Sequence, residues 1–309
     1  MQEAPRVSVI IPNQNRLDKK EYWDTLYKLK ALEGRRQTFL DNNLKRTIKT
    51  LFGKNLFNYI KEYVLRSYSD YILWDVIYKK YLPDTKGLKA LEIGSAPGDK
   101  IVRLNRTFGF IPYGVEYSGY GVALNRNAFS LHGINPDNVI HADFLSEEFL
   151  ARYAGYFDIV ISNGVIEHFI DVKKTIEKHI NLLAKGGCLV VSIPNFKGVN
   201  YIFARLFHKW FLQMHNLSIM DKKAFAGLFS RKDLRALFCG YYGVFNFGLF
   251  DNVKNSRLTY VILYFCNALQ LILNAAFRLL CRDKQAENGF FSPYLIFIGI
   301  NNKGNRGAL

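Results

Sequence analysis

A glycine-rich run, LEIGSAPGDK at residues 91–100, could bring a ligand close to the protein backbone. Gly94 and Gly98 carry no side chain that would obstruct a nucleotide-like ligand at a turn between a strand and a helix. A dinucleotide fingerprint requires small residues at the first, third and sixth places of such a loop, and the sixth place here is Asp99. The run therefore predicts a nucleotide-like ligand without a pyrophosphate cradle.

Polar residues also stand at the ends of the neighbouring strand-like segments. Glu92 ends the segment before the loop, Glu116 ends the next one, and Asp143 ends the third. A carboxylate after the second strand can accept hydrogen bonds from both hydroxyls of a ribose, and an acid after the third suits the exocyclic amine of adenine. The fourth segment ends with Asn163 and Gly164. Because parallel strands end at one edge of an open sheet, we expect these residues to converge on one crevice.

In this order, the motifs resemble those of the class I S-adenosylmethionine-dependent methyltransferases, particularly small-molecule members related to ubiquinone-biosynthesis O-methyltransferases. The likeness covers residues 87–195 well and the last strands loosely. It implies S-adenosylmethionine as cofactor, with Glu92 and the loop glycines around its methionine part, Glu116 on the ribose and Asp143 facing the adenine. The cofactor-binding residues expected on this basis are Glu92, Gly94, Ser95, Ala96, Gly98, Glu116, Tyr117, Asp143, Phe144, Asn163 and Gly164. Ala96 departs from the glycine that is commoner at the middle of this loop.

The segment VIEHF supplies the candidate catalytic residues. Transfer from a sulfonium uses an activated donor, so the protein mainly aligns the acceptor and excludes water. A hydroxyl acceptor benefits from a base, and His168 lies where related enzymes face their substrate. Glu167 could orient His168 or carry a charge of its own. The alternative is that His168 only caps or packs the following helix, and His215 is a weaker candidate on the substrate side.

The cysteine and acid patterns predict no metal site. Cys188, Cys239, Cys266 and Cys281 are scattered without a C-x-x-C pair, which also argues against a disulfide framework. No group of acids and amides beyond Asp143 suggests a magnesium site. The fourth strand lacks the Asn/Asp-Pro-Pro-Tyr run of amino-methylating enzymes, and no Pro-Cys pair offers the nucleophile for methylation of cytosine carbon.

The elements that must position these residues alternate between apolar strands and amphipathic helices. The strands expected first are KALEI, IPYGVE, NVIHAD, FDIVIS and GCLVVSI, and the last two are GVFNFGLF and SPYLIFIGI. This alternation is typical of an α/β fold. We therefore predict a Rossmann-like, doubly wound, mostly parallel seven-stranded sheet with a helical N-terminal region and a helical cap.

Four regions are expected along the chain. Residues 1–86 form a helical N-terminal region that opens with a strand-like run at 7–11, and residues 87–195 form the S-adenosylmethionine-binding core. Residues 196–240 form a helical substrate cap, and 241–302 hold the last two strands around an apolar helix at 258–281. The aromatic residues expected to form a lid over the acceptor, or simply to pack, are Tyr22, Trp23, Phe203, Phe207, Trp210 and Phe211.

The apolar helix raises the question of a membrane. Asn267, Gln270, Asn274 and Arg278 recur at three- and four-residue steps and form one polar stripe on it. A true span would put two strands of one sheet on opposite sides of a bilayer. The helix is therefore expected either to lie in the interface of an anionic membrane or to pack in the core or a dimer interface.

The 309 residues carry a formal net charge of +16, and this favours an anionic partner without choosing between lipid, glycan and nucleic acid. The leading prediction is O-methylation of a small, lipid-linked or glycan acceptor. The alternatives are an RNA methyltransferase, although the basic residues are dispersed and no nucleic-acid module is visible, and a non-catalytic binding protein of the same fold. The N-terminus shows no secretory signal pattern. We therefore expect a location in the cytoplasm, either free or at the periphery of a membrane.

Overall fold

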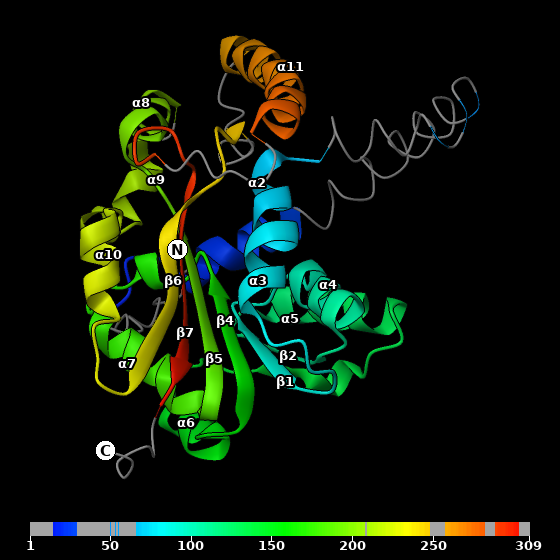
Figure 1. The fold of residues 1–309 in the computed structure, drawn as a ribbon, viewed down its shortest axis with the longest axis vertical. Helices are drawn as coiled ribbons and strands as arrows, with labels where there is room; N and C mark the ends of the chain where they lie inside the picture. The colour runs from blue at the N-terminus through cyan, green and yellow to red at the C-terminus, as the bar shows by residue number, and fades with distance from the viewer. Residues whose placement is uncertain are drawn as a thin grey trace, which may run out of the picture.

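The computed structural model describes residues 15–29, 50, 53, 55, 66–207, 209–247, 257–281 and 288–302. Its centre is a seven-stranded sheet in the order β3-β2-β1-β4-β5-β7-β6 (Figure 1). The strands are β1 Lys89–Ile93, β2 Ile111–Glu116, β3 Val139–His141, β4 Phe157–Asn163, β5 Leu183–Pro194, β6 Leu234–Tyr242 and β7 Tyr294–Asn301. The first five pair in parallel, and β7 runs antiparallel between β5 and β6. The predicted doubly wound, mostly parallel fold is confirmed.

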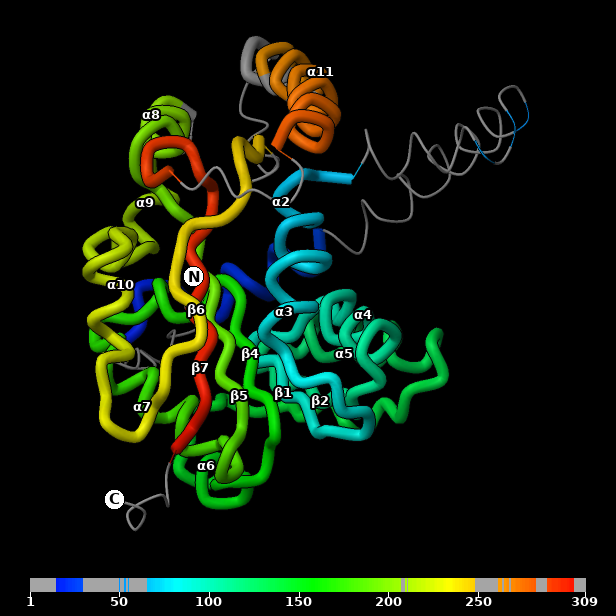
Figure 2. The backbone as a smooth tube through the Cα atoms, viewed as in Figure 1, coloured from blue at the N-terminus to red at the C-terminus, as the bar shows by residue number. Residues whose placement is uncertain are grey.

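Helices cover both faces of the sheet, as the tube in Figure 2 makes plain. The α-helices are α2 Tyr68–Tyr71, α3 Lys79–Tyr81, α4 Asp99–Phe108, α5 Gly119–Leu131, α6 Glu147–Tyr153, α7 Val172–Leu182, α8 Gly198–Phe207, α9 Lys209–Gln213, α10 Lys222–Leu228 and α11 Arg257–Leu280. One π-helical segment, η2, spans Ile72–Tyr78 between α2 and α3. The short 3-10 helices are η3 Pro136–Asn138, η4 Ile166–His168 and η5 Leu217–Ile219. One apolar cluster joins the sheet to α6, α7 and α10, and the other joins it to η2, α4 and α5.

The central strands are buried on both faces, which explains why they read as continuous apolar runs. Leu91 and Ile93 of β1 belong to one apolar cluster, while Ala90 of the same strand belongs to the other. This alternation turns the two faces of each strand toward different helix layers and leaves the carboxyl ends of the strands free for a site.

The sixth strand was predicted at the wrong place. Residues 243–250 were expected to form it, but β6 is Leu234–Tyr242, within the stretch expected to be helical cap. Each residue of β6 from Phe238 to Tyr242 faces a partner on β7, and the backbone then turns at Gly243 and Phe245, both of which have positive φ. Exposed Arg235 and Ala236 interrupt the apolar pattern of this edge strand, and the glycine- and phenylalanine-rich sequence that follows resembles a strand. The helical cap therefore ends with α10.

The described part of the N-terminal region is helical, as expected. A helix spans 20–29, and α2, η2 and α3 follow before β1. Arg16 forms an isolated antiparallel bridge with Phe169, which ties the segment at 15–29 to the loop after β4. The strand-like run at 7–11 lies outside the described residues.

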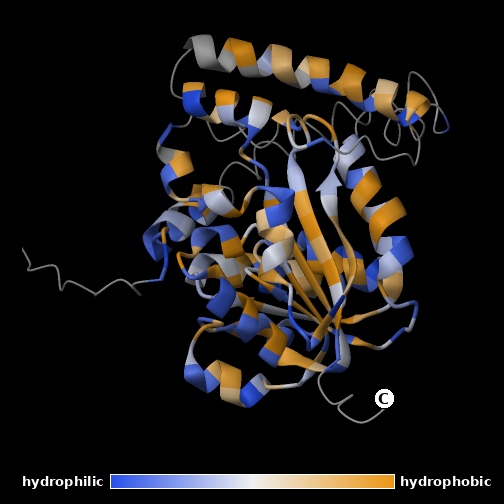
Figure 3. Cartoon of the chain, turned by 60° about the vertical axis from the view of Figure 1, so that its left-hand side comes forward, coloured by the Kyte–Doolittle hydropathy of each residue, from blue (hydrophilic) through white to orange (hydrophobic). Residues whose placement is uncertain are grey.

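The apolar helix is present as α11, inserted between β6 and β7. Figure 3 shows α11 lying across one end of the molecule. None of the described helices is long and apolar enough to cross a membrane.

Candidate active site

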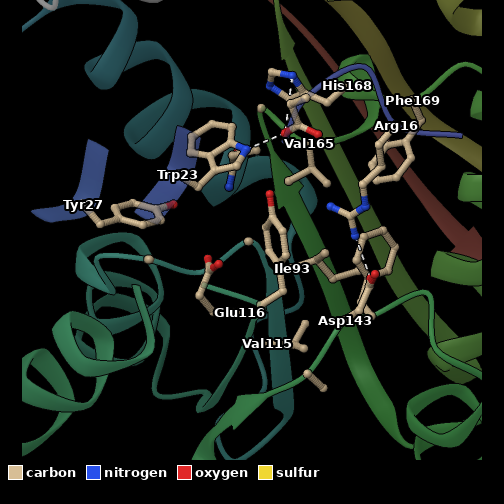
Figure 4. A pocket seen from close by; sticks show the side chains of 18 residues that line it. Arg16, Trp23, Tyr27, Ile93, Val115, Glu116, Asp143, Val165, His168 and Phe169 are labelled. Carbon is tan, nitrogen blue, oxygen red and sulfur yellow. Dashed lines mark hydrogen bonds and ion pairs between the residues drawn. The ribbon is translucent and has the colours of Figure 1, made fainter. Parts of the chain in front are cut away.

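A cavity lies at the carboxyl ends of β1, β2 and β4, where the open sheet predicts a ligand site. Ile93, Glu116 and Asn163 bring the three strand ends to it, and residues from 15–29 cover it (Figure 4). Most of the predicted cofactor residues line this cavity: Gly94, Ala96, Glu116, Tyr117, Asp143, Phe144, Asn163 and Gly164. The ends of β1, β2 and β4 and the residues that follow β3 therefore meet at one cavity, as the sequence predicted.

Three predicted cofactor residues do not line the cavity but lie next to those that do. Ser95 accepts a hydrogen bond from the side-chain amide of Asn125 on α5. Gly98 precedes α4 with φ of 105°, and a Cβ there would lie 2.5 Å from Oδ1 of Asn125, so only glycine fits. Glu92 accepts a hydrogen bond from Nδ2 of Asn163 at 3.2 Å. These residues shape and support the cavity wall.

Glu116 lies at the end of β2 with 3% of its surface exposed. One of its oxygens, Oε1, accepts a hydrogen bond from the backbone N–H of Ser118 at 2.9 Å. Burial raises the pKa of the carboxyl, while the surrounding backbone N–H groups lower it. Glu116 also lines the cavity, so its carboxyl oxygens are placed where they could accept hydrogen bonds from a ligand.

Asp143 is engaged by a residue that the sequence did not reveal. Nη2 of Arg16 lies 2.7 Å from Oδ1 of Asp143, and the guanidinium stacks over the rings of Tyr117 and Phe169, 4.6 and 5.0 Å from their centroids. Figure 4 shows this pair across the cavity. Because Arg16 is 127 positions from its partner and belongs to no motif, no local pattern could have identified it.

The segment at 15–29 supplies three further lining residues, Asp18, Trp23 and Tyr27. Nε1 of Trp23 donates a hydrogen bond to Asp18, and the Trp23 ring meets His168 edge-on with centroids 5.5 Å apart. Tyr27 is buried beside Gly121, close to Glu116. Trp23 was expected as part of a lid, whereas Asp18 and Tyr27 were not.

A second, larger cavity of about 460 Å³ adjoins the first, whose volume is about 170 Å³. The two share Trp23, Asn163, Gly164 and His168. The second cavity extends to residues from α2, η2, α4, β5 and β6, and to Phe211, Asn246 and Tyr294. Of the other expected lid aromatics, Phe203 packs on Phe247 instead, while the side chains of Phe207 and Trp210 lie outside the described residues.

His168 lies on the boundary between the two cavities, and its environment fixes its tautomer. Nδ1 lies 2.8 Å from the carbonyl oxygen of Met214, which can only accept, so Nδ1 carries the proton and Nε2 the lone pair. A carboxylate oxygen of Asp18 is 3.8 Å from the same Nδ1. Burial lowers the pKa of His168 to about 4, so the ring is neutral at neutral pH.

Glu167 and His215 complete a buried group around His168. Nδ1 of His215 donates to the carbonyl oxygen of Phe211 at 2.7 Å, and burial lowers its pKa to about 3. Burial raises the pKa of Glu167 to about 8, and its Oε2 has no hydrogen-bond partner. Within the described part of the chain this is the one group whose three side chains could together hold a metal ion, with ligand atoms within 4.8 Å of one another. The sequence patterns gave no sign of it, because His215 comes from a distant segment.

The class I S-adenosylmethionine-dependent methyltransferases have a sheet with this strand order and a cavity at the ends of the strands that correspond to β1, β2 and β4. The methyltransferase-domain family matches residues 60–241. The chain belongs to this family, and the cofactor of the class is S-adenosylmethionine.

Individual proteins are similar to the chain at lower levels. The ubiquinone biosynthesis O-methyltransferase of Psychrobacter cryohalolentis is 27% identical over 168 residues, covering 49% of this chain and 62% of the relative. The chain thus spans less than two thirds of that relative's length. The structure of MccD protein matches with a TM-score of 0.50 at 12% identity, over 75% of this chain and 96% of that one. Phosphoethanolamine N-methyltransferase 2 of Haemonchus contortus, in complex with S-adenosyl-L-methionine, matches with a TM-score of 0.48 at 13% identity, over 83% and 59% of the chains.

The residues present fit this cofactor. Oε2 of Glu92 is buried without a hydrogen-bond partner behind the loop, where a cationic group would compensate it. At Gly94, with φ of 66°, a Cβ would lie 3.0 Å from the Val165 side chain, so glycine suits both the backbone conformation and the narrow space at this turn. Gly94 would border the methionine part, Glu92 would support it from behind the cavity wall through Asn163, and Glu116 would hold the ribose.

Proposed function

We propose that the protein transfers a methyl group from S-adenosylmethionine to the hydroxyl of a small, lipid-linked acceptor bound in the second cavity, with His168 as the base. The observation that carries this proposal is that His168 lines both cavities. A group in that position touches donor and acceptor together. The match to ubiquinone biosynthesis O-methyltransferases agrees with an oxygen acceptor.

The chain's residues would align the acceptor and remove its proton. S-adenosylmethionine, when bound, supplies a methyl group on a sulfonium, which needs no further activation. Nε2 of His168 accepts the proton of the acceptor hydroxyl as the carbon–oxygen bond forms, while Met214 and Asp18 hold the ring through Nδ1. Glu167 and His215 lie beside His168, with one polar atom of each within 4.8 Å of the others, and enclose the ring on its buried side. Trp23 separates this centre from solvent on the side of 15–29.

Replacement of His168 by alanine tests the proposal. We expect turnover to fall by about 10²–10⁴-fold, with the dissociation constant for S-adenosylmethionine, measured by calorimetry, within a few-fold of the wild-type value. His132→Ala is the matched control, because His132 is an exposed histidine outside both cavities. Unchanged turnover in His168→Ala would mean that His168 only packs in the structure and takes no part in the reaction.

Assays with and without EDTA separate proton transfer from a metal-dependent role of the same group. Proton transfer by His168 predicts turnover that EDTA does not change. A loss of activity that zinc or magnesium restores would contradict the role of His168 as a base.

A further inference from the structure

Helix α11 packs on the protein through its polar side. Gln270, Asn274 and Arg278 are each no more than 8% exposed. Oδ1 of Asn274 accepts hydrogen bonds from the backbone N–H of Tyr68 on α2, at 3.1 Å, and from Nε2 of Gln270. Arg278 stacks on Tyr71 at 3.6 Å. Three of the four residues of the predicted polar stripe, Gln270, Asn274 and Arg278, therefore lie on the inner face of the helix, and the side chain of Asn267 is outside the described residues.

The outer face of α11 is apolar. Its exposed large side chains are Val261, Tyr264, Phe265, Leu269, Leu271, Ile272, Leu279 and Leu280. Phe265 is 67% exposed and Ile272 is 66% exposed. Figure 3 shows these apolar stretches along the helix at the end of the molecule. A soluble surface rarely carries so continuous a row of large apolar side chains without a partner.

Helix α8 extends this face. Phe203 of α8 contacts Phe247 with ring centroids 5.5 Å apart, and the backbone N–H of Phe247 donates to Oε1 of Gln270 on α11. Ile202 and Leu206 of α8 are 51% and 71% exposed. We call the exposed apolar side chains of α8 and α11 the apolar face.

The chain segments that carry α8 and α11 contain basic residues and lack acidic ones. Residues 197–220 and 252–282 contain no Asp or Glu at all. Arg205 and Lys209 are exposed beside Ile202 and Leu206. A second copy of this chain would bring the same cations against each other, whereas an anionic lipid surface would neutralise them.

The apolar face adjoins the second cavity. Ser67, Ser69 and Asp70, on and next to α2, line that cavity, and α11 packs on the same helix through Tyr68. Asn246 also lines the second cavity, and the next residue, Phe247, contacts both α8 and α11. An acceptor whose tail remains in a bilayer under α11 would therefore have its head group close to His168.

We propose that the apolar face docks the protein flat on an anionic lipid bilayer, and that the acceptor enters the second cavity from that bilayer. The helix lies in the interface and does not cross it, because β6 and β7 on either side of α11 are paired in one sheet. This inference rests on the proposed function for the acceptor, while the docking itself does not depend on turnover.

Flotation of the full chain with vesicles tests the docking. We expect binding to vesicles of phosphatidylglycerol and phosphatidylcholine, weaker binding to phosphatidylcholine alone, and weakening by 0.5 M salt. Phe265→Glu and Ile272→Glu should each reduce the partition to anionic vesicles by about tenfold or more. Leu131→Glu is the matched control, since Leu131 is 74% exposed on α5, at the opposite edge of the sheet.

Two outcomes would overturn the docking. One is a wild-type protein that stays with the soluble fraction at low salt. The other is a stable dimer, measured by sedimentation, that Ile272→Glu converts to a monomer without any vesicle binding. Calorimetry with S-adenosylmethionine on the same variants distinguishes the docking proposal from the proposed methyl transfer. A variant that still binds the donor but no longer binds vesicles supports the docking face, whatever its turnover on soluble acceptors.

Discussion

Glu116 is the residue that we propose binds the donor through its carboxyl group. It is almost fully buried, and its carboxylate is compensated by the backbone N–H groups around it. A buried carboxylate is costly unless its acceptors are hydrogen-bonded. On our proposal, the ribose hydroxyls of the donor would complete the hydrogen bonds of Glu116.

Glu116→Gln keeps the shape of the side chain and removes its charge. We expect the dissociation constant for S-adenosylmethionine to rise by about 10- to 100-fold, because a hydrogen bond to a charged group contributes roughly 1.5–3 kcal/mol. Isothermal calorimetry measures the change. Asp137→Asn, at an exposed position in η3, should leave the constant unchanged, and an unaltered constant in Glu116→Gln would remove Glu116 from the donor site.

His179 offers a test of burial that does not involve the ligand. Its Nδ1 bonds the carbonyl oxygen of Thr175, its Nε2 bonds Oγ of Ser162, and burial lowers its pKa to about 4. The unfolded chain takes up a proton near the ordinary pKa of 6.5, while the folded chain does not. Stability contributed by neutral His179 is therefore present above pH 6.5 and lost as the pH falls toward 4.

The expected result is a difference in unfolding free energy between the wild type and His179→Gln that shrinks by about 1.4 kcal/mol per pH unit below pH 6.5. Urea denaturation at pH 7, 6 and 5 measures it. His132→Gln, at an exposed position, should show no such trend. A difference that is constant with pH would mean that His179 titrates normally in the folded protein.

Among single residues, those expected around the donor could be predicted from the sequence, whereas Arg16, His215 and the surroundings of His168 could not. Glu116, Asp143 and Asn163 could be placed from sequence because Glu116 and Asn163 end strands and Asp143 follows β3 by two residues, and strand ends of a parallel sheet meet. Arg16 and His215 could not, because each reaches the site from a segment with no periodic relation to the sheet. The geometry of His168 was equally hidden, since Met214, which fixes its tautomer, is 46 positions away.

Among the elements, α5 shows how closely a helix can approach the site. A Cβ at Gly121 would lie 2.8 Å from Cγ of Glu116 and 3.0 Å from both Ala96 and Tyr27. Because residue 121 is a glycine, α5, the loop after β1 and the segment at 15–29 can all approach the carboxyl group of Glu116. The first turn of α5 therefore packs directly behind residues that line the cavity, Ala96, Glu116 and Tyr27.

Gly121→Ala should separate binding from stability. Alanine favours the helix by about 1 kcal/mol, but its methyl group displaces Glu116 and Tyr27, which we expect to weaken donor binding by roughly 5- to 30-fold. Gly119→Ala in the same turn has nothing within 4 Å of its Cβ and is the control. Calorimetry and thermal unfolding together decide the matter, and equal affinities in the two variants would contradict the close approach.

The elements also show what periodicity can and cannot predict. The first five strands and β7 were identified because buried strands are continuous apolar runs. β6 was missed because it lies at the edge, where only one neighbour constrains its residues. The stripe on α11 was recognised, but the sequence could not say which of its two faces met the protein, because either side can be buried when the polar residues find partners.

For the molecule as a whole, the net charge of +16 had left lipid and nucleic acid as competing partners. The structure shows cations next to the apolar face, at Arg205 and Lys209. Single-stranded nucleic acid is bound by basic grooves with stacking aromatic rings, whereas cations beside aliphatic side chains suit a lipid interface.

We therefore expect methyl label from the donor to appear in the lipid fraction when the protein is given a total lipid extract and total RNA together. Organic extraction followed by scintillation counting of both phases measures the distribution. His168→Ala provides the background. Label confined to the RNA would support the alternative of an RNA methyltransferase and contradict a lipid-linked acceptor.

The pairing of β6 with β7 has a consequence for how the protein is assembled from parts. The two strands are antiparallel neighbours, and Tyr242 faces Tyr294 at the end of the ladder from which the chain leaves toward α11. Everything between these two tyrosines is one excursion from a hairpin, and it contains both α11 and Asn246, which lines the second cavity. A change in this one excursion would therefore alter the apolar face and the acceptor cavity together, while the loop after β1 lies outside it.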